Sequence, residues 1–241
     1  MIKKWGIGIE HEMRIRFTKS VSELSDNVKN KLFNDLKNEY IFIDSNTLLY
    51  YFSMYEITFF KSGKVKIGCL FEETVLGGRK FAAQYVWFYK NGVVRSGYLA
   101  ENTLVDGVIF KKGTEITCYD KGDISKGTLA EDGTYKGINL QGNEGIGIFQ
   151  NRSLAYGTLA QDRAIDGITF KKGAYIEFFL NGRVAKGTLA KNTHIKKITF
   201  KAGTKVQFHR SGAVYRGTLT NGKQMFYNEK GKPIQVYDTI D

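Results

Sequence analysis

Apolar residues recur along most of the chain at a fixed spacing of 30 residues. They fall into columns that take one residue from each repeat. The columns are Phe110, Leu140, Phe170 and Phe200; Val86, Ile116, Ile146, Ile176 and Val206; Val94, Ile124, Leu154, Val184 and Val214; and Leu99, Leu129, Leu159, Leu189 and Leu219. Apolar positions at a constant phase mark the buried side of stacked repeats. We therefore expect these columns to form a continuous core.

The clearest sign of the repeat is the tetrad Gly-Thr-Leu-Ala, which starts at Gly127, Gly157 and Gly187. Within each repeat the pattern is that of β-strands, because Ile176 and Phe178 alternate with Glu177. The pair Asn181-Gly182 is typical of a tight hairpin turn with two positive-φ residues. We predict a mainly β fold, in which residues 58–220 form a repeat array of antiparallel β-hairpins. A β-solenoid with one coil per repeat is the alternative.

Two shorter segments flank the array. Residues 1–57 predict a small α/β capping segment, with a strand from Trp5 to Phe17, a helix over about 21–38 and a short strand over 40–43. A second helix would place Leu48, Leu49, Phe52 and Tyr55 on one face. Residues 221–241 predict a capping hairpin, in which Pro233 would protect the edge of the sheet.

Composition adds limits to this picture. The chain has 27 glycines and one proline, so its turns must use glycine at positive φ. It starts without the apolar core of a secretory signal and contains no apolar run of about 18 residues, so we expect a soluble, intracellular (cytoplasmic) protein without a transmembrane segment. Cys69 and Cys118 are expected to stay unpaired, and Cys118 takes a slot that other repeats fill with phenylalanine.

A net charge of +12 favours partners that carry negative charge, such as nucleic acid, an anionic surface or an acidic protein. Lysines come before turn glycines, where they also deter edge-to-edge pairing of sheets. An aromatic slot next to the inward column is expected to face outward, either to contact a partner or to stabilise the sheet by cross-strand pairing. The candidate contact residues are Tyr89, Tyr119, Phe149 and Phe179, with Lys111, Lys112, Lys171 and Lys172 at one edge.

The stretch from Trp5 to Met13 resembles the opening strand of glutamate–cysteine-ligase-like amidoligases of large DNA viruses. The resemblance implies that Glu10 and Glu12 would hold magnesium and the phosphates of ATP. It extends to about residue 57, and beyond that point repeats replace the long sheet that such a ligase needs. The alternative is that both carboxylates pair with Arg14 and Arg16 or face solvent.

The phrase Phe-(Phe/Tyr)-x-Asn-Gly-x-Val-x-x-Gly-Thr-Leu-Ala is similar to the MORN-like repeats of bacterial proteins. The resemblance implies β-hairpin arrays that scaffold, contact membranes or bind proteins, and it implies no reaction. We predict a non-catalytic protein that needs no cofactor and presents an extended surface to a macromolecular partner, most simply a protein. The alternatives are charge-driven binding of nucleic acid or an anionic surface, and a reduced ATP- and magnesium-dependent ligase.

Overall fold

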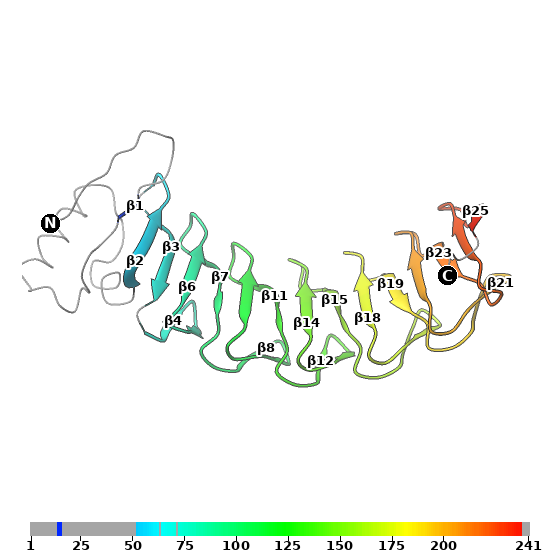
Figure 1. Ribbon diagram of the computed structural model, residues 1–241, viewed down its shortest axis with the longest axis horizontal. Coiled ribbons are helices and arrows are strands. Elements are labelled where there is room, and N and C mark those ends of the chain that lie inside the picture. The colour runs from blue at the N-terminus through cyan, green and yellow to red at the C-terminus, as the bar shows by residue number, and fades with distance from the viewer. Residues whose placement is uncertain (1–13, 16–51, 63, 71, 238–241) are drawn as a thin grey trace, which may run out of the picture. The chain divides into compact units, whose positions relative to one another are not determined.

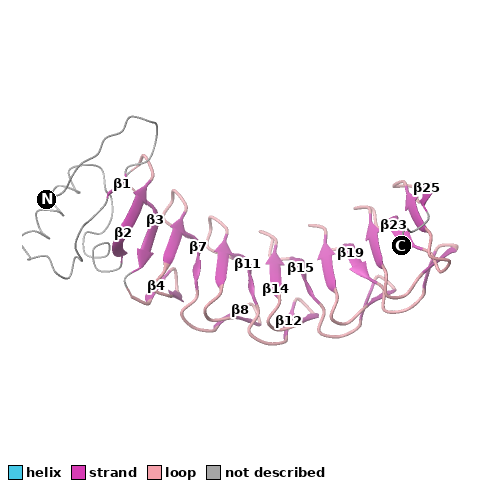
Figure 2. Ribbon diagram, in the orientation of Figure 1, coloured by secondary structure: helices cyan, strands magenta, loops and turns pink. Residues whose placement is uncertain are grey.

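A computed structural model describes residues 14–15, 52–62, 64–70 and 72–237. The chain divides into two compact units, Met1–Thr103 with Lys112–Ile124 and Leu104–Lys111 with Ser125–Asp241. Regular structure in the described ranges consists of β-strands, and none of these residues is helical (Figure 2). The mainly β prediction is therefore confirmed.

The first unit contains one antiparallel sheet with the strand order β1-β2-β3-β6-β7-β10. Its strands are β1 (Arg14–Ile15), β2 (Phe52–Phe59), β3 (Val65–Leu70), β6 (Tyr85–Phe88), β7 (Val94–Tyr98) and β10 (Glu115–Cys118). A short hairpin formed by β4 (Thr74–Leu76) and β5 (Arg79–Phe81) follows β3. β8 (Thr103–Val105) lies where the two units divide.

The second unit continues the same plan with the order β11-β14-β15-β18-β19-β22-β23-β24-β25, and its strands follow one another in Figure 1. They are β11 (Ile124–Thr128), β14 (Gly145–Ile148), β15 (Leu154–Thr158), β18 (Tyr175–Phe178), β19 (Val184–Thr188), β22 (Lys205–Phe208), β23 (Val214–Thr218), β24 (Gln224–Tyr227) and β25 (Pro233–Tyr237). Its short strands are β9 (Val108–Phe110), β12 (Gly133–Tyr135), β13 (Ile138–Leu140), β16 (Arg163–Ile165), β17 (Ile168–Phe170), β20 (Thr193–Ile195) and β21 (Ile198–Phe200).

Each repeat thus contributes two hairpins. A long hairpin, such as β18–β19, joins the sheet of its unit, and a short hairpin, such as β16–β17, stands apart from that sheet. All these pairings are antiparallel, so the hairpin array is confirmed and the solenoid alternative is wrong.

The predicted apolar columns form the core. Phe110, Leu140, Phe170 and Phe200 are at most 1% exposed, as are Val86, Ile116, Ile146, Ile176 and Val206. The valine, isoleucine and leucine column from Val94 to Val214 is also buried. Leu219 differs from the other members of its column, because it is only half-buried where the array reaches its last repeat.

Every residue of the tetrad has an identifiable task, which the copy at 187–190 illustrates. A Cβ on Gly187 would lie 2.5 Å from Cδ1 of Phe170, so glycine lets this ring pack directly on the sheet. The carbonyl of Thr188 accepts the Lys171 N–H, and the Ala190 N–H binds the Thr169 carbonyl. Leu189 is fully buried and forms a β-bridge with Phe170. The tetrad therefore holds the short hairpin against the long one by backbone hydrogen bonds and by packing.

The long hairpins turn differently from our prediction. At Asn181-Gly182 only the glycine has positive φ, at 81°, whereas two positive-φ residues were expected. The Phe179 N–H binds the Arg183 carbonyl across a three-residue loop, in which the left-handed residue comes last and the register shifts at Phe178. Two consecutive positive-φ residues occur instead in the short hairpins, for example at Asp166-Gly167.

The second N-terminal helix was predicted wrongly for the residues that the structure describes. Phe52 and Tyr55 lie in β2, which pairs with β1 and β3. The pairing available along Phe52–Phe59 outweighs the helical spacing of a few aromatic residues. The remaining predictions for residues 1–13 and 16–51 lie outside the described residues, while the strand predicted at Arg14–Ile15 is present.

The C-terminal hairpin is present as β24–β25, and Pro233 is the first residue of its outer strand. Cys69 and Cys118 are both free, as expected. Burial raises the pKa of the Cys118 thiol, so this residue acts as a small apolar side chain of the core.

Candidate binding surface

The sheet of the second unit has one face that packs on the core and one face that does not. Cross-strand pairing aligns one row of side chains on the second face: Lys126, Gly147, Tyr156, Glu177, Lys186, Gln207, Arg216, Phe226 and Gln235. A parallel row lies two residues along each strand: Thr128, Gly145, Thr158, Tyr175, Thr188, Lys205, Thr218, Gln224 and Tyr237. We call these two rows the open face, and we include Tyr215, whose ring packs on Phe226 of the first row.

Aromatic and charged side chains meet in the middle of the open face. The rings of Tyr156 and Tyr175 lie 5.6 Å apart. The ammonium of Lys186 lies 5.8 Å from the centroid of the Tyr175 ring and 3.7 Å from the Glu177 carboxylate. Tyr175 is 42% exposed, so this cluster offers an aromatic surface with charge beside it.

A second cluster lies toward the C-terminal edge of the open face. The Phe226 ring packs edge-on against Tyr215 at 5.9 Å and against Tyr237 at 5.5 Å. The guanidinium of Arg216 lies 5.7 Å from the Phe226 centroid. Tyr215 and Tyr237 are 41% and 47% exposed. The edge of the sheet therefore presents aromatic rings with a cation over one of them.

A hollow of about 230 Å³ lies beside this second cluster. Lys205, Arg216, Thr218 and Gln224 line it, together with Gly217. Its lining carries two positive charges, from Lys205 and Arg216, and no carboxylate. The hollow therefore suits an anionic or hydrogen-bonding group of a partner.

The hydroxyls of Tyr156 and Tyr175 stay protonated at neutral pH. Partial burial raises the pKa of Tyr175 to about 12, and the nearby Glu177 carboxylate and Tyr156 add to the effect. Burial also raises the pKa of Tyr156. Both hydroxyls are therefore hydrogen-bond donors throughout the physiological range.

One of the two glycines of β14 leaves room for the Tyr156 ring. A Cβ on Gly147 would lie 2.2 to 2.7 Å from the Tyr156 ring, so this ring lies across the glycine backbone. A Cβ on Gly145 would meet nothing within 4 Å. Gly147 therefore allows the close contact between this ring and the strand backbone.

The first unit also has aromatic residues on the face away from its core. Tyr85 is 40% exposed, and its ring centroid lies 6.1 Å from that of Trp87. Trp87 pairs with Ser96 across the sheet. The alternation of core and open positions is thus the same in the two units.

The four residues of the predicted aromatic row take equivalent positions in their repeats, but these positions lie at the loops of the long hairpins. In each repeat the N–H of the aromatic residue binds the carbonyl four residues later. The Tyr89 hydroxyl donates to the Cys118 carbonyl at 2.8 Å, and the Arg210 guanidinium lies 6.0 Å from the Phe179 centroid. Tyr89, Tyr119, Phe149 and Phe179 are all half-buried. Tyr89 and Phe179 thus each contact the next long hairpin.

The predicted lysines lie at the other end of the strands. Lys171 and Lys172 come before β18, whereas Phe179 comes after it, so the structure does not bring the lysines and the aromatic row together. Lys112 comes before β10 in the same way and is exposed. The Lys111 ammonium donates to Oδ1 of Asn143 at 2.6 Å.

Sequence reasoning missed the open face. Its signal was present in the residues that alternate with the buried column, because Tyr175 and Glu177 flank Ile176. Glu10 and Glu12, the candidate metal ligands, lie outside the described residues. Within the part of the chain that the structure describes, no group of three or more histidine, cysteine, aspartate or glutamate side chains could hold a metal ion. No described helix is long and apolar enough to span a membrane.

Comparison with known proteins gives no family. No family model matches the chain, and no curated protein matches it. Among solved structures the chain is similar to an alternansucrase determined in complex with isomaltononaose, with 17% sequence identity and a TM-score of 0.15. The match covers 75% of this chain and 18% of that one. A similarity at this level carries no argument about function.

Proposed function

We propose that the protein is a non-catalytic repeat protein whose open face binds a macromolecular partner, in the first place another protein. The observation that supports this proposal is the combination of exposed tyrosines and cations in aligned rows on the face of the sheet that does not pack on the core. The resemblance of the repeats to MORN-like arrays agrees with a scaffold or binding role.

The residue types on the open face are those that stabilise protein interfaces. Tyrosine and arginine are enriched at the centres of interfaces, where their large side chains contribute most of the binding free energy. Neighbouring strands lie about 4.8 Å apart, so the rows from β11 to β25 cross roughly 40 Å of sheet. That length suits an interface of standard size, which covers about 800 Å² on each partner.

The proposal is tested by quantitative affinity enrichment, followed by titration of the purified partner. The test variant is Tyr175→Ala with Tyr215→Ala and Arg216→Gln. The control variant is Leu180→Ala, since Leu180 is 53% exposed and lies in a hairpin loop away from the open face. We expect one partner to bind wild type and control equally and the test variant at least tenfold more weakly. Equal binding to all three proteins would contradict the proposal.

Nucleic acid is the second candidate partner, because a cation lies over an aromatic ring at two places on the open face. Stacking of bases on aromatic rings and neutralisation of phosphates by nearby cations is a common mode of single-strand binding. This candidate predicts that affinity for a fluorescent single-stranded oligonucleotide falls steeply between about 50 and 200 mM salt. Absent or salt-independent binding would exclude it.

A further inference from the structure

A pocket of about 340 Å³ lies where the row of short hairpins ends. In the earlier part of the second unit each short hairpin has a successor; a Cβ on Gly133 in β12, for example, would lie 3.2 Å from Val108 in β9. After β20–β21 the chain passes through β22 and β23 and reaches β24 by a three-residue loop. No described short hairpin follows β21, and the pocket lies in that place.

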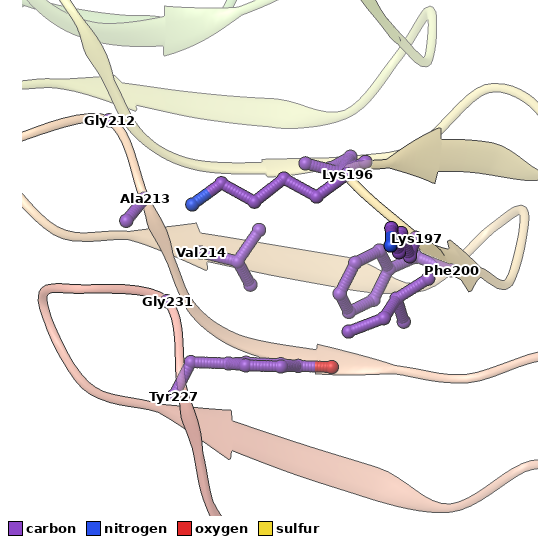
Figure 3. Close-up of a pocket in the computed structure, with 10 residues that line it drawn as sticks. Lys196, Lys197, Phe200, Gly212, Ala213, Val214, Tyr227 and Gly231 are labelled. Carbon is purple, nitrogen blue, oxygen red and sulfur yellow. The ribbon is translucent and has the colours of Figure 1, made fainter.

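The pocket has an apolar wall (Figure 3). Its apolar lining comes from Ile195, Ile198, Phe200, Ala213, Val214 and the ring of Tyr227. Phe200 and Tyr227 meet edge to face at 6.1 Å and form one side of the pocket. Pockets that bind small molecules are commonly at least about 300 Å³ and are mostly apolar with a few polar groups.

Two lysines provide the charged part of the pocket. Lys196 and Lys197 occupy the turn of the last short hairpin. The equivalent turn one repeat earlier is Asp166-Gly167. In Figure 3 the Lys196 side chain extends over Val214 toward Ala213, and Lys197 also lines the pocket. Neither lysine forms an ion pair with a described residue. The substitution of Asp-Gly by Lys-Lys therefore adds positive charge at this pocket.

A glycine lies next to the ammonium group of Lys196. Gly231, at φ 76°, lies across the pocket, and a Cβ there would be 2.7 Å from Nζ of Lys196. A residue with a side chain at this position would displace the ammonium. The Lys196 ammonium therefore lies close to the loop between β24 and β25.

A buried hydroxyl without a partner points to a ligand independently. Tyr227 is 2% exposed, and among the described residues its hydroxyl has no hydrogen-bond partner. Phe226 and Gln207 pair with Arg216 from the two sides of β23, so they lie in the same row of the sheet. Tyr227 follows Phe226 as Phe208 follows Gln207, so Tyr227 takes the position that Phe208 has in the preceding repeat. The hydroxyl is therefore an addition to a slot that needs only an aromatic ring. A buried hydroxyl that makes no hydrogen bond is destabilising, because it has given up its hydrogen bonds to water.

We propose that this pocket binds a small amphipathic carboxylate. The apolar body of the ligand lies against Phe200, Val214 and the Tyr227 ring, and its carboxylate is bound by the ammonium groups of Lys196 and Lys197. The Tyr227 hydroxyl donates a hydrogen bond to a polar atom of the same ligand. This site is separate from the open face and does not depend on the proposed function.

The test is a titration of the full chain with indole-3-acetate, followed by two-dimensional NMR, with neutral indole-3-acetamide as the matched ligand. We expect the acetate to bind saturably and the amide to bind at least about fivefold more weakly. The variant Lys196→Gln with Lys197→Gln should weaken acetate binding by about fivefold and leave amide binding unchanged.

Two further variants control for a general effect of charge and for an effect on folding. Lys171→Gln with Lys172→Gln removes the same charge elsewhere in the unit and should leave the acetate affinity unchanged. Tyr227→Phe keeps the ring that the preceding repeat uses, so it should fold and bind both ligands more weakly. Absence of acetate binding at millimolar concentration, or equal binding by wild type and the Lys196/Lys197 variant, would overturn the proposal.

Discussion

Substitution of Gly187 by alanine tests the physical reason for the repeat signature. Gly187 lies in β19, and Phe170, which is 1% exposed, packs on its backbone. An added Cβ would lie 2.5 Å from Cδ1 and 2.8 Å from Cε1 of this ring, which is closer than carbon atoms can approach. Because Phe170 is enclosed by the core, the ring cannot move away without displacing its neighbours.

The expected cost follows from the size of this overlap. Insertion of one methyl group into a filled core destabilises by about 1–3 kcal/mol. Gly145→Ala is the matched control, since its Cβ meets nothing within 4 Å and alanine is favoured over glycine in a strand by about 0.5 kcal/mol. Phe170→Ala alone should cost about 3–5 kcal/mol, and adding Gly187→Ala to it should cost almost nothing further.

Urea unfolding followed by far-UV circular dichroism measures these differences in the free energy of unfolding. We expect Gly187→Ala to lower the midpoint and Gly145→Ala to leave it unchanged or raise it. The double variant should unfold close to Phe170→Ala. If Gly187→Ala is as stable as Gly145→Ala, the glycine has no packing role and this explanation of the tetrad is wrong.

Three further predictions concern single positions. Arg152→Gly should stabilise by about 1 kcal/mol, because arginine is held at φ 62° where other repeats have glycine; thermal unfolding should show a higher midpoint. Glu177→Gln should lower the pKa of Tyr175 from about 12, and ultraviolet titration measures it; the stability that this tyrosine contributes is present below its ordinary pKa of 10.0 and is lost as pH rises toward 12. Asn181→Ala removes the amide that donates to the next loop at 3.2 Å and should cost about 1 kcal/mol in urea unfolding, while Lys121→Ala, at an equivalent position, should not.

The fold could be predicted because the same apolar positions recur in every repeat. An apolar residue at a single position has many explanations, but the columns of Phe170 and Ile176 recur in successive repeats, and burial on one side of a sheet is the structure that satisfies all of them. The Asn-Gly pair located the long hairpin loops correctly. It could not give the loop type, because Asn-Gly fits a two-residue turn and also the last two positions of a three-residue loop.

The candidate site was harder to predict, because neighbouring residues at a strand end do not continue the strict alternation of faces. Tyr119 and Phe179 follow the ends of their strands, so the rule that adjacent residues face opposite sides does not extend to them. Tyr175 lies within the strand and obeys the rule. The terminal pocket could not be predicted, since it depends on which short hairpin has no successor.

The central claim is that each repeat buries one face of the sheet and leaves the other face exposed. Hydroxyl-radical footprinting of the free protein tests it directly, because oxidation rates follow side-chain exposure. We predict that Tyr175, Tyr215 and Tyr237 react at least about tenfold faster than Tyr135, which is fully buried. Equal rates for the open-face tyrosines and Tyr135 would contradict the account.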